Sequence, residues 1–287
     1  ADEVFLKVLV VCDSKSKATF AHAVPSKGLD DKGFIVRCIA DDVSWLGYSR
    51  LVLKCDNEPA IVAVLREALK AVRIDGVDQA MEEHPPPYDS QANGKVESTV
   101  QSVRGMTRTL QVALEEQLKS KIPVTHPVMH WLVGHAADIL SWRLRGLDGL
   151  TAYQRARGKP FVYKLIGFAE RCNFKFNSKA PTGDSERWNL GIYVGRDRLN
   201  GQHIIFNPAS AEVCRARTIM RLPNAQKWCR ESVAKISATP FQLHVDKGPE
   251  VIFQDKKVAA DEVRPIEHRL ARRVYTKKKI TRVGDLL

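Results

Sequence analysis

The spacing of apolar residues predicts an α/β arrangement in the first part of the chain. Two short apolar runs, Phe5–Cys12 and Ala18–Val24, are typical of buried strands. The segments Leu29–Leu46 and Pro59–Ala71 have the spacing of helices, and Arg50–Cys55 between them is typical of a third strand. Strands and helices that alternate in this way predict a sheet covered by helices.

The same alternation continues to Gly158. A short strand is predicted near Val77–Met81, and a long helix from about Gly94 to Lys119. Two further helices are predicted over Val128–Arg145 and Leu150–Arg157. Residues 1–158 therefore form the first predicted domain, a mixed sheet with helices.

The long helix has two different faces. Its apolar positions recur every three or four residues, which is the period of a helix. They are Val96, Val100, Val103, Thr107, Leu110 and Leu114. A polar stripe follows the same period on the opposite face, and it consists of Glu97, Gln101, Arg104 and Arg108. A carboxylate followed by two arginines on one stripe suits metal binding beside phosphate binding, although a solvated polar face would have the same pattern.

Beyond Gly158 the pattern changes to short strands separated by Gly and Asn. The predicted strands are Phe161–Phe168, Asn173–Phe176, Leu190–Val194, His203–Phe206 and Val213–Leu222. They predict a small β-rich, barrel-like domain over residues 159–237, which a helix over Asn224–Ile236 completes. Residues 238–287 have weak apolar spacing and are predicted to be a basic, flexible tail.

Charge divides the chain at the same place. Residues 1–158 contain 20 basic and 20 acidic residues, whereas residues 159–287 contain 25 basic and 13 acidic residues. The whole net charge of +12 therefore lies in the second part and favours a polyanionic partner there, although the tail could equally be a solubilising linker. The candidate phosphate-binding residues of this part are Arg196, Arg198, Arg215, Arg217 and Arg221.

Other patterns exclude several classes of protein. No apolar run is long enough to span a membrane, and no signal peptide is recognisable. The six cysteines form no C-x-x-C pair, so a disulfide scaffold and a cysteine zinc site are not expected. His126, His130 and His135 lack the Glu that a zinc-protease motif requires, so a metal site is not expected there, whereas Trp131 and Trp142 are expected to pack in the core.

Two acidic residues are candidates for metal binding. Asp56 follows a predicted strand, and Glu97 lies in the first turn of the long helix. If the fold brings them together, they could bind Mg²⁺, which prefers carboxylate oxygens and retains several waters. The alternative is that Asp56 is a turn residue and that Glu97 is a first-turn Glu favoured by the helix dipole.

At these residues the sequence resembles the integrases of copia-type retrotransposons and, more loosely, the retroviral integrases of the DDE family. The resemblance spans roughly residues 5–222, and its most specific segment is the one that ends in Glu97. The similar segments are Asp13-x-x-Ser16-Lys17, Val24-Pro-Ser-Lys27, Leu53-Lys-Cys-Asp56-Asn57, Ser90-Gln-Ala-Asn93-Gly94-Lys-Val-Glu97, Leu150-Thr-Ala-Tyr153 with Gly158-Lys-Pro160, Gly191-Ile-Tyr-Val-Gly195 and Arg215-Ala-Arg217-Thr-Ile-Met-Arg221.

The resemblance implies an RNase H-like fold and a piece of a retroelement polyprotein. It implies that Asp56 and Glu97 are catalytic and hold Mg²⁺ or Mn²⁺ during phosphodiester cleavage and strand transfer. It also implies that the partners are retroelement ends and target DNA, that the protein forms homo-oligomers, and that it acts in the nucleus. Lys95, beside Glu97, joins the candidate nucleic-acid contacts.

The sequence departs from the family pattern in ways that affect activity. Glu58 stands where the family usually has Gly, and Ser98 replaces the usual Arg after Glu97. The family's first strand and its catalytic Asp have no counterpart before Asp13, so we expect two unpaired sheet edges in the core. Three explanations stay open: a native protein that extends further upstream, a catalytically inactive DNA-binding relic, or Asp13 as a substitute ligand.

Overall fold

The strands of the first part form two separate pairs. The structure is a computed structural model, and it describes residues 6–83, 94–175, 188–245 and 253–255. Strands β1 (Val8–Cys12) and β2 (Thr19–Ala23) are antiparallel, whereas β3 (Arg50–Lys54) and β4 (Gln79–Glu83) are parallel. No strand joins β1 to β3 among the described residues. Within the described residues each pair is isolated, so both of its edges are unpaired, and these include the edges on β1 and β3 that the sequence predicts.

Helices cover both faces of the β1–β2 pair, because successive strand residues point to opposite faces. On the Leu9 side lie α1 (Phe34–Leu46) and α2 (Pro59–Ile74). On the Val10 side lie α3 (Gly94–Leu118) and α4 (Pro127–Arg143).

The β3–β4 pair is covered less completely. Leu51 and Leu53 pack against the cluster formed with α1 and α2. On the other face Val52 pairs in register with Met81, and these side chains are 50% and 58% exposed. This pair therefore has a covered face and an apolar face open to solvent.

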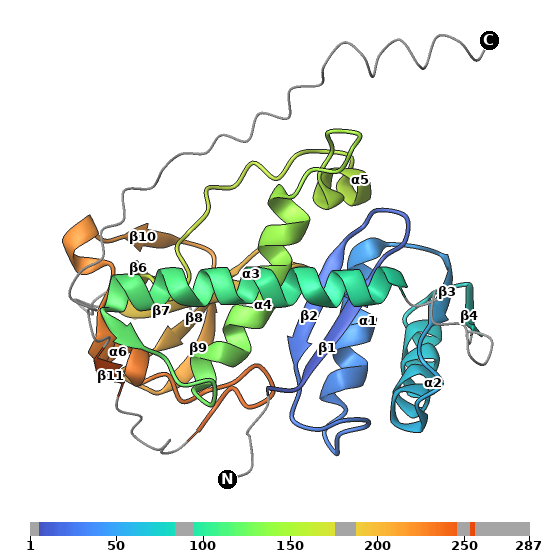
Figure 1. Cartoon of the computed structure of the whole chain (residues 1–287), viewed down its shortest axis with the longest axis horizontal. Helices are drawn as coiled ribbons and strands as arrows, with labels where there is room; N and C mark the ends of the chain where they lie inside the picture. Colours follow the sequence, from blue (N-terminus) through green and yellow to red (C-terminus); the bar gives the residue numbers. More distant parts are fainter. Residues whose placement is uncertain (1–5, 84–93, 176–187, 246–252, 256–287) are drawn as a thin grey trace, which may run out of the picture. The chain divides into compact units, whose positions relative to one another are not determined.

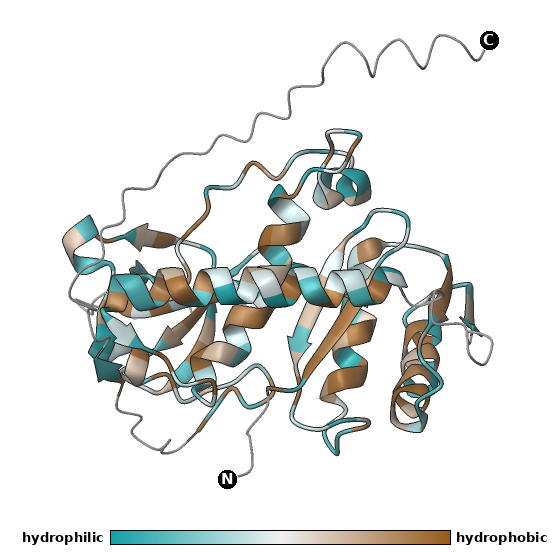
Figure 2. Cartoon of the chain, viewed as in Figure 1, coloured by the Kyte–Doolittle hydropathy of each residue, from teal (hydrophilic) through white to brown (hydrophobic). Residues whose placement is uncertain are grey.

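Helix α4 lies at the centre of the molecule (Figure 1). It contacts β2, α3, the short helix α5 (Ala152–Arg157) and the β-rich region. A helix with protein on most sides needs apolar residues around most of its circumference, and most of the residues of α4 are buried. Figure 2 shows the contrast with α3, along which hydrophilic and hydrophobic residues alternate. Among the described helices, none is long and apolar enough to cross a membrane.

The β-rich region is a five-stranded antiparallel sheet with the order β10-β6-β7-β8-β9. Its strands are β6 (Arg171–Phe174), β7 (Asn189–Arg196), β8 (His203–Asn207), β9 (Glu212–Ala216) and β10 (Ile219–Arg221). Only Arg217 and Thr218 separate β9 from β10, although these are the two edge strands. One continuous segment thus pairs first with β8 and then with β6, which curls the sheet towards a barrel.

Strand β7 is buried on both faces, which explains its uninterrupted apolar run. Tyr193 faces the inside of the curled sheet, whereas Ile192 and Val194 face a cluster shared with α3 and α4. The predicted boundary at Gly158 therefore separates two sheets but not two hydrophobic cores, and the compact unit that contains both runs from Ala1 to Lys256.

Three predicted elements need correction. Phe161–Phe168 contains no strand, because Phe161 instead stacks on Trp142 with ring centroids 4.2 Å apart. The helix predicted over Asn224–Ile236 is divided into a 3-10 turn (Asn224–Gln226) and α6 (Arg230–Ala234), since Cys229 between them has an extended backbone.

The beginning of the predicted flexible tail is also packed into the fold. Ala238 is fully buried and Phe253 nearly so, and both belong to the cluster shared with α3 and α4. Strand β11 (Gln254–Asp255) pairs with β5 (Ser120–Lys121). The basic residues between Arg264 and Arg282 lie outside the described residues.

Candidate nucleic-acid interface

The two candidate metal ligands lie at the ends of regular elements. Asp56 is exposed and follows β3 by two residues, and Glu97 is exposed in the first turn of α3. Glu58, which departs from the family pattern, has a structural role as the residue that caps α2. Its carbonyl oxygen accepts hydrogen bonds from Ile61 and Val62, and its carboxylate forms an ion pair with Lys27 at 2.6 Å.

These residues do not form a recognisable metal centre in the described part of the chain. No group of three or more His, Cys, Asp or Glu side chains there could hold a metal ion. Two exposed carboxylates could bind one hydrated Mg²⁺ at most, whereas the two-ion chemistry implied by the resemblance needs more ligands. The described residues therefore do not fit the implied pair of ions.

Asp13, the proposed substitute ligand, is instead the centre of a turn. Its Oδ2 accepts hydrogen bonds from the Ser16 amide at 2.7 Å, the Ser16 hydroxyl at 2.5 Å and the Tyr48 hydroxyl at 2.9 Å, and its Oδ1 accepts one from the Lys15 amide. Burial acts to raise the pKa of Asp13, but these hydrogen bonds outweigh it and lower the pKa. The Asp-x-x-Ser spacing is thus explained by local hydrogen bonding alone.

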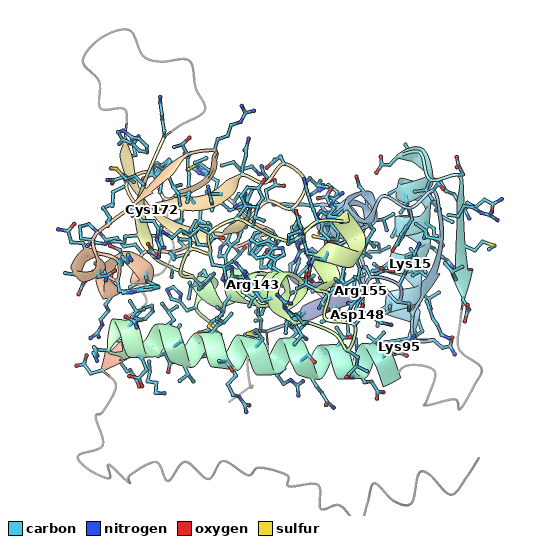
Figure 3. The ribbon with its side chains drawn as sticks, turned by 90° about the horizontal axis from the view of Figure 1, so that it is seen from above. Lys15, Lys95, Arg143, Asp148, Arg155 and Cys172 are labelled. Atoms are coloured by element: carbon cyan, nitrogen blue, oxygen red, sulfur yellow. The ribbon has the colours of Figure 1, made fainter. Side chains whose placement is uncertain are left out.

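The polar stripe of α3 is exposed as predicted. Lys95, Glu97, Gln101, Arg104 and Arg108 are all exposed, whereas Val103 and Leu114 on the other face are buried. Figure 3 labels Lys95 at the beginning of this helix. Two arginines and a carboxylate therefore follow one solvent-facing stripe, an arrangement that can contact the backbone of a nucleic acid, whereas Lys95, two residues before Glu97, lies off this stripe.

The arginines of the β-rich sheet occupy different environments. Arg217 is exposed in the link between β9 and β10. Arg196 is partly buried, and its guanidinium carbon lies 4.1 Å from the ring centroid of Tyr163. Arg215 is 57% exposed and forms an ion pair with Asp197 at 2.9 Å.

Two of the predicted phosphate-binding arginines are paired with carboxylates. Nε of Arg198 donates to Asp138 at 2.5 Å, and its Nη1 donates to Asp42 at 3.2 Å. Nε and Nη2 of Arg221 each donate to one carboxylate oxygen of Glu170 at 2.7 Å, and Glu170 is fully buried. Arg198 is 17% exposed and is bound by two carboxylates, so it stabilises the fold, whereas Arg221 is still 33% exposed beside Glu170 and its contact with phosphate stays a prediction.

No pattern in the sequence indicated the buried ionic network around Arg198. It joins α1, α4, β2 and the loop after β7, and His22 completes it with a contact of 2.8 Å to Asp42. Burial acts to lower the pKa of His22, but the Asp42 carboxylate outweighs it and raises the pKa to about 10. Asp42 is 156 residues from Arg198 in the chain, so no local motif could have revealed the network.

Two of the three histidines of the α4 region, His126 and His135, are buried, and His130 is partly buried with its ring centroid 5.4 Å from that of Phe241. His126 caps α4 by accepting a hydrogen bond from the Val128 amide at 3.2 Å. His135 lies against Phe168 and Tyr193, and burial lowers its pKa to about 4. Neutral, buried imidazoles of this kind are part of the core.

Comparisons with known proteins add little to this picture. Among solved structures, the catalytic core domain of BIV integrase aligns with 52% of this chain and 84% of its own, at 18% sequence identity and a TM-score of 0.37. A chain of the simian T-cell lymphotropic virus intasome, in complex with the PP2A regulatory subunit B56 gamma, aligns with 77% of this chain and 74% of its own, at 15% identity and a TM-score of 0.39. No protein-family model and no curated protein matches the chain. TM-scores this low do not establish a shared fold, and no residue role can be transferred from either structure.

Proposed function

We propose that the chain is a fragment of a retroelement integrase of copia type that binds DNA through the exposed stripe of α3. The observation that carries the proposal is the stripe itself, in which Glu97, Arg104 and Arg108 face solvent while the opposite face packs inwards. The order of the motifs in the sequence supports the integrase family, and the stripe is the proposed DNA-binding surface. Retroelement ends and target DNA are the proposed ligands, in a nuclear homo-oligomer released from a polyprotein.

DNA binding through this stripe has a measurable salt dependence. Each phosphate contact that is lost lowers the slope of log affinity against log salt by about 0.9. We expect the double variant Arg104→Gln/Arg108→Gln to lower the slope for duplex DNA by about 2, measured by fluorescence anisotropy between 50 and 200 mM salt. The matched control is Arg66→Gln/Lys70→Gln, which removes two exposed cations from α2. Equal slopes for the two double variants would refute the stripe as the DNA-binding surface.

Catalysis is the second, more demanding part of the proposal. Asp56 and Glu97 are its proposed acidic groups, with Mg²⁺ or Mn²⁺ as the cofactor, but no third ligand accompanies them in the described residues. The alternative function is therefore a catalytically inactive relic that only binds DNA. A strand-transfer assay on retroelement DNA ends with Mg²⁺ or Mn²⁺ distinguishes the two.

The matched variants for this assay lie on one helix. Glu97→Gln should abolish strand transfer if the chain is an enzyme, whereas Glu116→Gln, at an exposed position further along α3, should leave it unchanged. Activity that survives Glu97→Gln contradicts the catalytic role of Glu97. Absence of activity in the unmodified chain, with DNA binding retained, supports the relic.

A further inference from the structure

The loop between α4 and α5 places three leucines in solvent. Leu147 at its tip is fully exposed, and Leu144 and Leu150 on either side are 61% and 43% exposed. Contiguous exposed apolar surface is a sign of a binding site, and these three leucines lie within seven residues of one loop. Residues 144–150 are called the leucine loop below.

The leucine loop is held in one conformation by its own backbone. An antiparallel bridge joins Arg145 to Thr151, and the Gly146 amide donates to the Leu150 carbonyl oxygen at 2.9 Å. Gly149 closes the turn with a φ of +74°, which favours glycine, and its amide donates to the Gly146 carbonyl oxygen at 3.0 Å.

Arg155 fastens this loop to the rest of the fold. Its Nε donates to Asp148 at 2.8 Å, and its Nη2 donates to the Leu150 carbonyl oxygen at 3.0 Å. Its Nη1 donates to the Ser16 carbonyl oxygen at 3.2 Å, in the turn that Asp13 organises. Figure 3 shows Arg155, Asp148 and Lys15 close together. The loop is therefore ordered before a partner arrives, which reduces the entropy lost on binding.

The surroundings of the leucine loop are strongly basic. Residues 143–164 contain six basic residues and a single acid, Asp148, which Arg155 neutralises. The other five are all exposed, and they are Arg143, Arg145, Arg157, Lys159 and Lys164. Exposed leucines surrounded by basic residues fit a polyanion that also has an apolar interior, which the leucines can enter.

Two polyanions offer such a layer, and the small size of the tip favours one of them. A lipid bilayer needs more apolar area than a leucine tip provides, since even a myristoyl chain gives only marginal binding. Duplex DNA needs less, because proteins that bend it insert one or two apolar side chains between base steps while cations contact the flanking phosphates.

We propose that the leucine loop is a wedge that inserts Leu147 into the minor groove of duplex DNA and bends it. Arg145 and Arg157 contact the phosphates on either side. Figure 3 shows Asp148 of the loop and Lys95 of α3 towards the same end of the molecule, and in Figure 1 the loop stands above α3 and clear of it. A duplex that contacts both the stripe and the wedge has to run from α3 to the loop. This inference rests on the proposed DNA binding and deepens it by assigning a shape requirement to the ligand.

The test separates bending from binding. The full chain is mixed with a 30-base-pair duplex that carries a dye at each end, and the bend is measured by energy transfer. Leu147→Ser should abolish the bend and weaken affinity by about tenfold, without changing the salt slope. Leu199→Ser, at another exposed leucine that is 51% exposed, is the matched control and should bend DNA like the unmodified chain. Arg145→Gln/Arg157→Gln should lower the salt slope by about 2.

Each other outcome has a defined meaning. If Leu147→Ser binds and bends the duplex like the unmodified chain, the wedge is wrong while DNA binding stands. If neither the unmodified chain nor any variant binds DNA, the proposed function fails together with the wedge. Loss of binding to phosphatidylserine vesicles in Leu147→Ser, with DNA bending unchanged, would overturn the wedge in favour of a membrane contact. Loss of self-association in sedimentation velocity, again with bending unchanged, would overturn it in favour of a second copy.

Discussion

The arginines of α3 and those of the β-rich sheet look alike in the sequence, yet the fold uses them in opposite ways. Arg104 and Arg108 are exposed on a helix face that contacts solvent. Arg198 and Arg221 are bound to carboxylates within the fold. The excess of positive charge after residue 158 therefore overstates the phosphate-binding capacity of that region, and the electrically neutral first part supplies the clearer candidate surface.

The two sheets differ in the same direction. The β-rich sheet is continuous, and its strand β7 is covered on both faces. The strands of the first part form two separate pairs, and β3–β4 leaves Val52 and Met81 in solvent. A substitution in the buried strands of the β-rich sheet should therefore lower the free energy of unfolding more than a substitution on the exposed face of β3–β4.

Arg198→Met should show the largest difference between the two classes of arginine. The variant leaves Asp42 and Asp138 buried without their main cationic partner, and breaking such a network typically costs about 3–5 kcal/mol of the free energy of unfolding. Arg104→Met removes an exposed charge and should change this free energy by less than about 0.5 kcal/mol. Urea unfolding followed by circular dichroism measures both. Similar stability for the two variants would mean that the network around Arg198 contributes nothing net.

A glycine pair within β7 offers a smaller and more local test. A Cβ on Gly191 would lie 2.3 Å from Ile205 Cγ2 and 2.8 Å from Phe174 Cδ1, so Gly191→Ala forces the inside of the curled sheet to move. Such overpacking typically costs about 1–3 kcal/mol. A Cβ on Gly195 would meet only Ile204, at an ordinary 3.8 Å.

The control for that test is Gly195→Ala, which should leave the free energy of unfolding unchanged or slightly higher. Both variants can be compared in the same urea titration. An equal loss in the two would show that backbone flexibility, and not the packing inside the sheet, explains why the strand has glycines.

Most elements of the fold could be predicted from the sequence because their signals are local. The period of α3 gave both its length and the exposed stripe of Glu97 and Arg108. Pro59 correctly indicated the start of α2. Phe161–Phe168 was wrong because an apolar segment with strand-like composition can also pack side chain by side chain, as Phe161 does on Trp142.

The candidate site was harder to predict because its environment is made by distant residues. Nothing near Arg198 indicates that Asp138 and Asp42 occupy it, since these partners are 60 and 156 residues away. The same holds for Arg221, whose partner Glu170 is 51 residues away. Exposure of a charged residue on a strand depends on which face the fold covers, and the sequence of that strand does not contain this information.

The smallest predicted effect concerns Asp13, in the α/β part. Tyr48→Phe removes one hydrogen bond to the Asp13 carboxylate and should lower the free energy of unfolding by about 1 kcal/mol at neutral pH. Lys15, whose cation lies over the Tyr48 ring, keeps that contact in the variant because phenylalanine retains the ring. Tyr153→Phe, on α5, is a control because it removes a hydroxyl that does not contact Asp13.

The pH dependence of this effect distinguishes a turn acid from a metal ligand. Because the pKa of folded Asp13 lies below its ordinary value of 3.8, the stability that Asp13 contributes is complete above that value and is lost as the pH falls through the folded pKa. The difference between Tyr48→Phe and the unmodified chain should therefore be constant from pH 7 to about 5, and it should shrink below about pH 4 as the pH falls towards and through the lowered pKa of folded Asp13. Added Mg²⁺ should not change this difference, since Oδ2 of Asp13 already accepts three hydrogen bonds from Ser16 and Tyr48, which hold the carboxylate in its turn. A difference that disappears in Mg²⁺ at neutral pH would instead return Asp13 to the list of metal ligands.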